Sequence, residues 1–149
     1  MERMSKDEYF TKMGQLVSRR ATCARRSVGC VLVSSRGHVL ATGYNGTPSG
    51  SDHCIDSPCP GASYPSGTGL ERCEAVHAEQ NALLQCRNVF EIETAYVTAM
   101  PCMTCIKLLL NTSCKRIIYI EDYPHAEAKD LWIRNGRELL QAPATFSRS

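Results

Sequence analysis

The expected fold is decided by two stretches, His77-Ala78-Glu79 and Pro101-Cys102-Met103-Thr104-Cys105. Proline is favoured at helix starts, so the two cysteines, three residues apart, lie on one face of the first turn of an expected helix. The partial positive charge at a helix N-terminus favours the thiolate, the form in which cysteine binds metal. His77 lies at the start of a second expected helix. If the two N-termini meet at one sheet edge, an imidazole and two thiolates converge there.

Elements of alternating type extend outward from these stretches in the order α-β-β-α-β-α-β-α-β. The expected helices span 6–20, 77–87, 102–111 and 126–135, and the expected strands span 28–34, 39–44, 94–98, 116–120 and 137–141. Ser5 and Glu8 have the spacing of a capping box before the first helix. Strand and helix alternate in the second half, which predicts parallel strands with helices on both faces. The fold class is α/β, a three-layer α/β/α arrangement around a mixed five-stranded sheet.

Length and composition are typical of one globular domain spanning residues 1–149. The chain is 43% hydrophobic and 21% charged, the mixture of an ordinary folded protein. Segment 45–73 is rich in Gly, Pro, Ser and Cys and has no clear periodicity, so it is expected to form a long loop. Loops of this length are functional or are held by something other than a core. The polar segment 143–149 is expected to be a loose C-terminal tail.

Several classes of protein are disfavoured by the same sequence. Its apolar runs are far shorter than the ~20 residues that span a bilayer, and segment 1–7 lacks the apolar core of a signal peptide. A cytoplasmic location without membrane contact is therefore expected. Seventeen basic and fifteen acidic residues leave a net charge of +2, which does not indicate a nucleic-acid partner. Nine cysteines without a secretory signal favour metal ligands or buried packing residues over disulfides.

The three expected ligands suit a catalytic zinc ion, which typically has three protein ligands and leaves the fourth position to water. Glu79 follows His77 by about 200° around the helix, so it is poorly placed as a further ligand. It can instead take a proton from water and deliver protons to a ring nitrogen and a leaving amine. An isolated C-x-x-C also fits a redox pair or half of a structural zinc site. The combination of H-x-E with P-C-x-x-C is typical of zinc-dependent nucleobase deaminases.

Four further cysteines lie in or beside irregular segments: Cys23, Cys54, Cys59 and Cys73. A second, structural zinc held by these cysteines would explain how the long loop is ordered, because such a site supplies folding free energy. His53 is an alternative to one of the four. The other interpretation is that these cysteines are unliganded or form an occasional disulfide. Cys30 and Cys86 lie within expected elements and are interpreted as packing residues.

Three stretches resemble the deoxycytidylate (dCMP) deaminase family, a branch of the zinc-dependent cytidine deaminase superfamily. They are His77-Ala78-Glu79-Gln80-Asn81-Ala82-Leu83, Pro101-Cys102-Met103-Thr104-Cys105 and Gly43-Tyr44-Asn45-Gly46-Thr47-Pro48-Ser49-Gly50. The resemblance implies a cytidine deaminase-like fold and hydrolysis of dCMP to dUMP, which feeds thymidylate synthesis. It implies zinc bound by His77, Cys102 and Cys105, with Glu79 as the proton shuttle. The remaining cysteines resemble those of the bacterial and phage type, in which a second zinc is found.

The resemblance also implies residues that bind nucleotides. Asn45 is expected to contact the deoxyribose, and Ala78 is a further substrate-binding candidate. The candidates for the 5′-phosphate are Arg26, Ser27 and Tyr123. Family members are often hexamers that dCTP activates and dTTP inhibits together with Mg²⁺. The expected effector site comprises Tyr44, Asn45, Gly46, Gly50 and Asp52. From the residues alone, the arginine is equally a surface charge, the glycine-rich stretch a turn and the tyrosine a core aromatic.

Three competing functions use much of the same sequence. A deaminase of tRNA or single strands predicts a basic groove with stacking aromatics, which a net charge of +2 and 7% aromatic residues support little. A nucleoside deaminase does not require a phosphate pocket. A zinc-stabilised interaction module has no use for Glu79, because a structural zinc takes four protein ligands.

Overall fold

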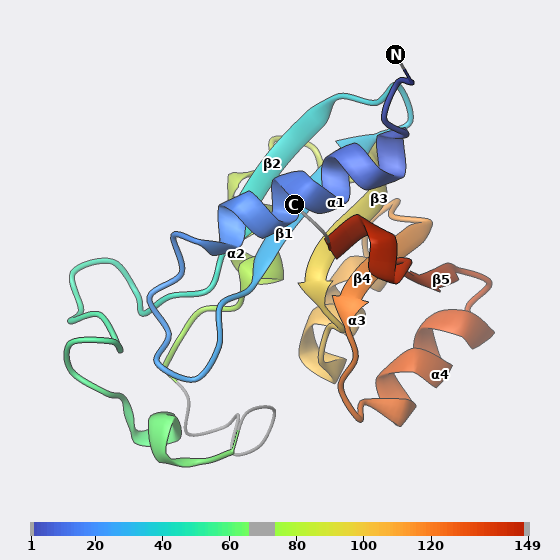
Figure 1. Ribbon diagram of the computed structural model, residues 1–149. Coiled ribbons are helices and arrows are strands. Elements are labelled where there is room, and N and C mark those ends of the chain that lie inside the picture. Colours follow the sequence, from blue (N-terminus) through green and yellow to red (C-terminus); the bar gives the residue numbers. More distant parts are fainter. Residues whose placement is uncertain (1, 66–73, 148–149) are drawn as a thin grey trace.

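The computed structural model contains a five-stranded sheet in the order β2-β1-β3-β4-β5 (Figure 1). It describes residues 2–65 and 74–147. The strands are β1 (Gly29–Ser34), β2 (Val39–Tyr44), β3 (Ile92–Ala99), β4 (Arg116–Glu121) and β5 (Glu138–Gln141). β1 is antiparallel to both β2 and β3, whereas β3, β4 and β5 are mutually parallel. The expected mixed sheet, with parallel strands in the second half, is confirmed.

The four helices are α1 (Lys6–Ser18), α2 (Ala78–Gln85), α3 (Met103–Leu110) and α4 (Ala126–Arg134), and η1 (Pro60–Ser63), η3 (Val89–Glu91) and η4 (Ala144–Ser147) are short 3₁₀ turns. The Ser5 hydroxyl accepts a 3.1 Å hydrogen bond from the Glu8 amide at the start of α1, as its spacing predicts. His77 and Cys102 have extended backbones and cap α2 and α3 instead of lying within them. Both helices therefore begin one residue later than expected.

The two faces of the sheet are covered by different helices, which makes the three layers (Figure 1). Along β1, Val31 and Val33 pack toward α1 with Phe10. Cys30 and Leu32 alternate with them and join the larger core formed with α2, α3 and α4. Because β1 is covered on both faces, it is apolar throughout instead of alternating between apolar and polar residues.

The long segment between β2 and α2 contains η1 and otherwise irregular backbone in its described part. Its two ends are joined by an antiparallel bridge, in which the amides of Gly46 and Val76 donate to each other's carbonyl oxygens. The segment also lies beside the chain that follows α1, since the Ile55 amide donates to the Thr22 carbonyl at 3.1 Å. In Figure 1 it projects beyond the sheet on the side away from β5.

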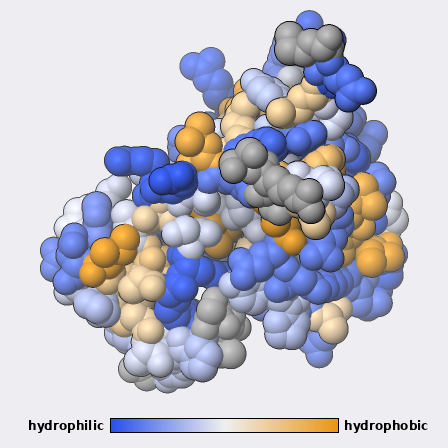
Figure 2. All heavy atoms as spheres, viewed as in Figure 1, coloured by the Kyte–Doolittle hydropathy of each residue, from blue (hydrophilic) through white to orange (hydrophobic). Residues whose placement is uncertain are grey.

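The surface shows no sign of a membrane-spanning element among the helices that the structure describes. None of these helices is long and apolar enough to cross a bilayer. Figure 2 shows polar residues over most of one face, with hydrophobic residues in small separate groups. At the C-terminal end, Ala142 packs against the Phe10 side of the core, and η4 follows it.

One glycine brings β2 into direct contact with α2. A Cβ atom at Gly43 would lie 2.4 Å from both the Ala78 carbonyl oxygen and the Ala82 amide nitrogen. Such distances are impossible, so only glycine permits this spacing between strand and helix. Gly43 therefore sets how closely the helix that begins after His77 approaches the sheet.

We predict that Gly43→Ala destabilises the protein by about 1–3 kcal/mol, because the added methyl group forces α2 away from β2. Thermal unfolding should show a melting temperature several degrees lower. Gly14→Ala is the matched control, since a Cβ there has its nearest neighbour at an ordinary 3.6 Å. Equal melting temperatures for Gly43→Ala and the wild type would contradict the close approach.

Candidate active site

Three candidate metal ligands meet at the starts of α2 and α3. The Nδ1 atom of His77 lies 3.3 Å from Cys105 Sγ and 3.5 Å from Cys102 Sγ. Within residues 2–65 and 74–147, these three form the one group of at least three His, Cys, Asp or Glu side chains whose ligand atoms lie within 4.8 Å of one another. The convergence expected from the sequence is thus present. It arises because two helices on the same face of the sheet direct their N-terminal ends to one point.

The donor set and its spacing fit a zinc ion. Tetrahedral zinc with bonds of about 2.1 Å to nitrogen and 2.3 Å to sulfur separates these atoms by about 3.6 Å. The observed nitrogen–sulfur distances are within a few tenths of an ångström of that value. Imidazole together with soft thiolates is also the ligand set of zinc rather than of magnesium or calcium. Three protein ligands leave one position open.

The electrostatics of the group already favour one thiolate. A hydrogen bond from the Cys105 thiol lowers the pKa of Cys102 to about 3. The pKa of Cys105 is correspondingly raised, because that thiol donates its proton to Cys102. Hydrogen bonding to Cys102 also raises the pKa of His77. Anionic sulfur at the start of α3 is further favoured by the helix dipole.

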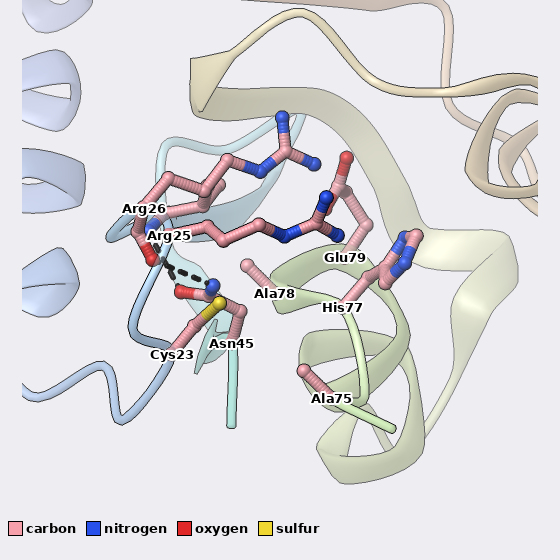
Figure 3. Close-up of a pocket in the computed structure, with 9 residues that line it drawn as sticks. Cys23, Arg25, Arg26, Asn45, Ala75, His77, Ala78 and Glu79 are labelled. Carbon is pink, nitrogen blue, oxygen red and sulfur yellow. Dashed lines mark hydrogen bonds between the residues drawn. The ribbon is translucent and has the colours of Figure 1, made fainter. Parts of the chain in front are cut away.

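Glu79 lies beside the metal ligands without joining them. It is in the first turn of α2, is only 4% exposed, and lines a pocket together with His77 and Ala78 (Figure 3). Burial raises the pKa of its carboxyl group. A buried carboxylate next to an open metal position is suited to exchanging protons with a reactant there.

The start of α2 is fixed by a residue that the sequence analysis missed. The Gln80 side-chain oxygen accepts a 2.8 Å hydrogen bond from the His77 amide. This contact holds the backbone of His77 in its extended conformation just before the helix. The signal was available, because Gln three residues after an N-cap is half of a capping box.

Most of the expected substrate residues line the same pocket. It is bounded by Cys23, Arg25, Arg26, Val28, Asn45, Ala75, His77, Ala78 and Glu79 (Figure 3). The Tyr123 ring lies under the Arg26 guanidinium, 4.9 Å from its central carbon. Ser27 is exposed and is not among the lining residues. The structure therefore brings Arg26, Asn45 and Ala78 together and leaves Ser27 at the surface.

Asn45 holds the backbone beside the pocket. Its Oδ1 accepts from the Val28 amide at 2.8 Å, and its Nδ2 donates to the Arg26 carbonyl at 3.0 Å, as the dashed lines in Figure 3 show. Asn45 is 5% exposed, so these bonds replace water that it has lost. The side chain thereby fixes the segment that carries Arg26.

Three of the five expected effector residues line a second hollow, which shares no lining residue with the first. Tyr44, Gly46 and Gly50 line it together with His53 and Leu84. Neither Asn45 nor Asp52 is among its lining residues. The Asp52 carbonyl oxygen instead accepts a 2.9 Å hydrogen bond from the Thr47 hydroxyl.

Two of the four expected ligands of a second zinc are close together. The sulfur atoms of Cys54 and Cys59 are 3.8 Å apart, and both residues are buried. Cys23 is also buried, and the bond between Ile55 and Thr22 places its segment next to Cys54. Cys73 lies outside the described residues. His53, the alternative ligand, is exposed.

Comparison with known proteins places these features in a family. The zinc-binding region of cytidine and deoxycytidylate deaminases matches residues 4–121. The chain belongs to this family. Its match contains all three residues of the His/Cys/Cys group and Glu79.

Individual members of the deaminase family resemble the chain over most of its length. The deoxycytidylate deaminase of Mycobacterium phage D29 is 41% identical over 126 residues, covering 80% of this chain and 97% of the phage protein. The enzyme of Schizosaccharomyces pombe is 40% identical over 125 residues, covering 81% of this chain. A structure of cyanophage S-TIM5 dCMP deaminase in complex with dCMP and dUMP superposes with a TM-score of 0.76 at 27% identity, covering 95% of this chain and all of the other.

The chain spans less than two fifths of the length of the two yeast deaminases that it matches, 38% for Schizosaccharomyces pombe and 39% for Saccharomyces cerevisiae. A tRNA adenosine deaminase structure has a TM-score of 0.57 at 17% identity. That likeness shows the shared deaminase fold alone.

We predict that Cys105→Ser lowers the affinity for zinc by more than about 100-fold. Loss of a residue that only supports a metal ligand already lowers metal affinity by about 10–100-fold. Cys105 offers its sulfur directly to the metal, and serine is a poor replacement. Metal analysis after dialysis against a weak chelator measures the effect. Cys86→Ser is the control, because this cysteine lies at the end of α2 outside the group. Equal zinc retention in the two variants would contradict the assignment.

Proposed function

We propose that this protein is a zinc-dependent hydrolase that deaminates dCMP to dUMP and ammonia. The observation that carries the proposal is the three-ligand His77/Cys102/Cys105 group beside a buried carboxylate, in a pocket that Arg26 also lines. Family membership supports the zinc chemistry. The names of the phage and yeast relatives, and the cyanophage complex with dCMP and dUMP, support the substrate.

The metal would be held by Nδ1 of His77 and the two sulfurs. Bound zinc supplies Lewis acidity, which makes hydroxide available as a nucleophile at neutral pH. The chain's own contribution is to hold the ligands at the required spacing and to leave one position open. Closure of that position by a fourth protein ligand would instead favour a structural role.

Glu79 would act as the proton shuttle. Its carboxylate would accept the two protons of the attacking water in turn, passing the first to the ring nitrogen and the second to the departing amine, so that water and dCMP give dUMP and ammonia. Its burial keeps bulk water from exchanging these protons. Its place beside the metal ligands, but outside their group, supports this role.

Substrate binding would use the remaining pocket residues. Arg26 offers a planar cationic donor, which suits a 5′-phosphate. Asn45 would approach the deoxyribose, and Ala78 would lie against the nucleotide. Tyr123 packs against the Arg26 guanidinium and helps to orient it. Ser27, the next residue in the chain, stays a further candidate for the phosphate. A nucleoside deaminase would not need Arg26, so selectivity for the phosphate separates the two alternatives.

Regulation and assembly form part of the same proposal. The hollow lined by Tyr44, Gly46 and Gly50 is our candidate for an effector site that binds dCTP, or dTTP with Mg²⁺, in a hexamer; Asn45 and Asp52 complete the expected set. No residue that lines this hollow also lines the catalytic pocket among the lining residues given above, which supports a separate binding role. We further propose a structural zinc on Cys23, Cys54, Cys59 and Cys73, which the 3.8 Å approach of Cys54 and Cys59 supports. The expected location is cytoplasmic.

We predict that Glu79→Gln lowers kcat for dCMP by about 10²–10⁴-fold, the contribution typical of general acid–base catalysis. Zinc content should stay equal to that of the wild type, because Glu79 is outside the ligand group. Ammonia release and metal analysis on the same preparation measure both quantities. Loss of zinc together with activity would show that Glu79 is structural and overturn its role as shuttle.

We also predict that ammonia release is confined to dCMP when the protein is given dCMP, CMP, deoxycytidine and a short cytosine-containing single strand. Each assay is run with and without dCTP, and activation of dCMP turnover by dCTP is the expected response. Comparable turnover of deoxycytidine would point to a nucleoside deaminase. Turnover of the strand would point to a polymer deaminase. An unchanged rate with dCTP would overturn the regulatory part alone.

A further inference from the structure

Two buried nitrogen atoms, one on a residue that lines the catalytic pocket and one on a residue that lines a hollow with Met103, have no hydrogen-bond partner among the described residues. They are a terminal guanidinium nitrogen of Arg26 and Nε2 of His125. A buried polar nitrogen without a partner destabilises the folded state, so native structures rarely retain one. Both belong to side chains that pack against the Tyr123 ring, so a group with acceptor oxygens beside that ring is a candidate partner for them.

Both side chains are held against the same aromatic ring. The Arg26 guanidinium lies 4.9 Å from the centre of the Tyr123 ring. The His125 ring stacks on Tyr123, with 6.0 Å between ring centres and 19° between planes. The tyrosine therefore fixes the orientation of both donors. Because Arg26 comes from the segment before β1 and His125 from the start of α4, the contact also joins two distant parts of the chain.

The pKa of His125 is influenced by charged groups of the catalytic site. Burial lowers its pKa, and the nearby charges of Cys102 and Arg26 shift the pKa further, in opposite directions. The other charged groups beside it are already paired, since Lys129 Nζ lies 2.5 Å from Asp122 Oδ1. Arg26 and His125 thus remain as the two donors with unused capacity.

We propose that His125 is a phosphate-binding residue, which donates from Nε2 to the 5′-phosphate of the nucleotide while Arg26 contacts the same group. This inference rests on the proposed function and adds a residue to its substrate site. A neutral imidazole protonated at Nε2 suffices as a donor. A monophosphate offers three terminal oxygens, so it could accept hydrogen bonds from both the Arg26 and the His125 nitrogen.

The test compares binding of dUMP with binding of deoxyuridine, because neither is turned over and they differ only in the phosphate. We expect His125→Ala to raise the Kd for dUMP by about 10-fold or more, the usual effect of losing a hydrogen bond to a charged group. The Kd for deoxyuridine should not change. Isothermal titration calorimetry on the zinc-loaded protein gives both values.

Two further variants make the result specific. His125→Gln keeps a side-chain N–H donor and should restore part of the affinity for dUMP. His38→Ala is the matched control, because His38 is exposed in the turn between β1 and β2 and its loss should change neither Kd. Retained zinc content and melting temperature verify that each variant is folded. If the alanine variant does not fold, His125→Phe replaces it, because phenylalanine keeps an aromatic ring against Tyr123 but has no N–H donor.

The outcomes separate the two proposals. If the wild type binds dUMP much more tightly than deoxyuridine and His125→Ala discriminates equally well, only the assignment of His125 fails. The assignment also fails if His125→Ala weakens both ligands equally, since that indicates a purely structural role. If the wild type itself does not distinguish the two ligands, the phosphate site and the proposed substrate fail together.

Discussion

The position of one nitrogen atom, Nδ1 of His77, constrains much of the structure. Two sulfur atoms from α3 lie 3.3 and 3.5 Å from it, and metal–ligand distances tolerate errors of only about 0.2 Å. The helix that begins after His77 must therefore be fixed relative to α3 with comparable accuracy. Packing of both helices on one face of the sheet provides this, and the backbone contact at Gly43 sets the spacing between α2 and β2.

The sequence correctly predicted those structural features that depend on residues close together in the chain. The capping serine before α1 and the alternation of strands and helices in the second half have short-range causes, and both are present in the structure. The metal group was also predictable. Its ligands lie at helix starts, and the topology brings helix starts to one edge. Several boundaries differ by one or two residues from those expected. α2 and α3 begin one residue late because His77 and Cys102 keep extended backbones before the first helical turn, α1 ends at Ser18 instead of residue 20, and β3 spans Ile92–Ala99 instead of 94–98.

The features that sequence could not reveal depend on contacts between distant segments. Nothing near Asn45 in the chain indicates that its side chain holds the backbone of Arg26 and Val28, since that requires the register between β1 and β2. The stack of Arg26, Tyr123 and His125 joins residues nearly a hundred positions apart. The turn preferences of glycine explain only part of the stretch 43–50. The role of Gly43 depends instead on the close approach of α2 to β2.

The bridge between Gly46 and Val76 has a consequence for how relatives of this protein vary. It joins the two ends of the long segment immediately beside the catalytic pocket, so the pocket walls are set at the bridge. Segments of different length can be accommodated beyond it, because the entropy of closing a loop rises only slowly with the number of residues. A change of length beyond the bridge therefore leaves the catalytic metal ligands in place, although it would alter the cysteine pair and the second hollow that lie within the segment.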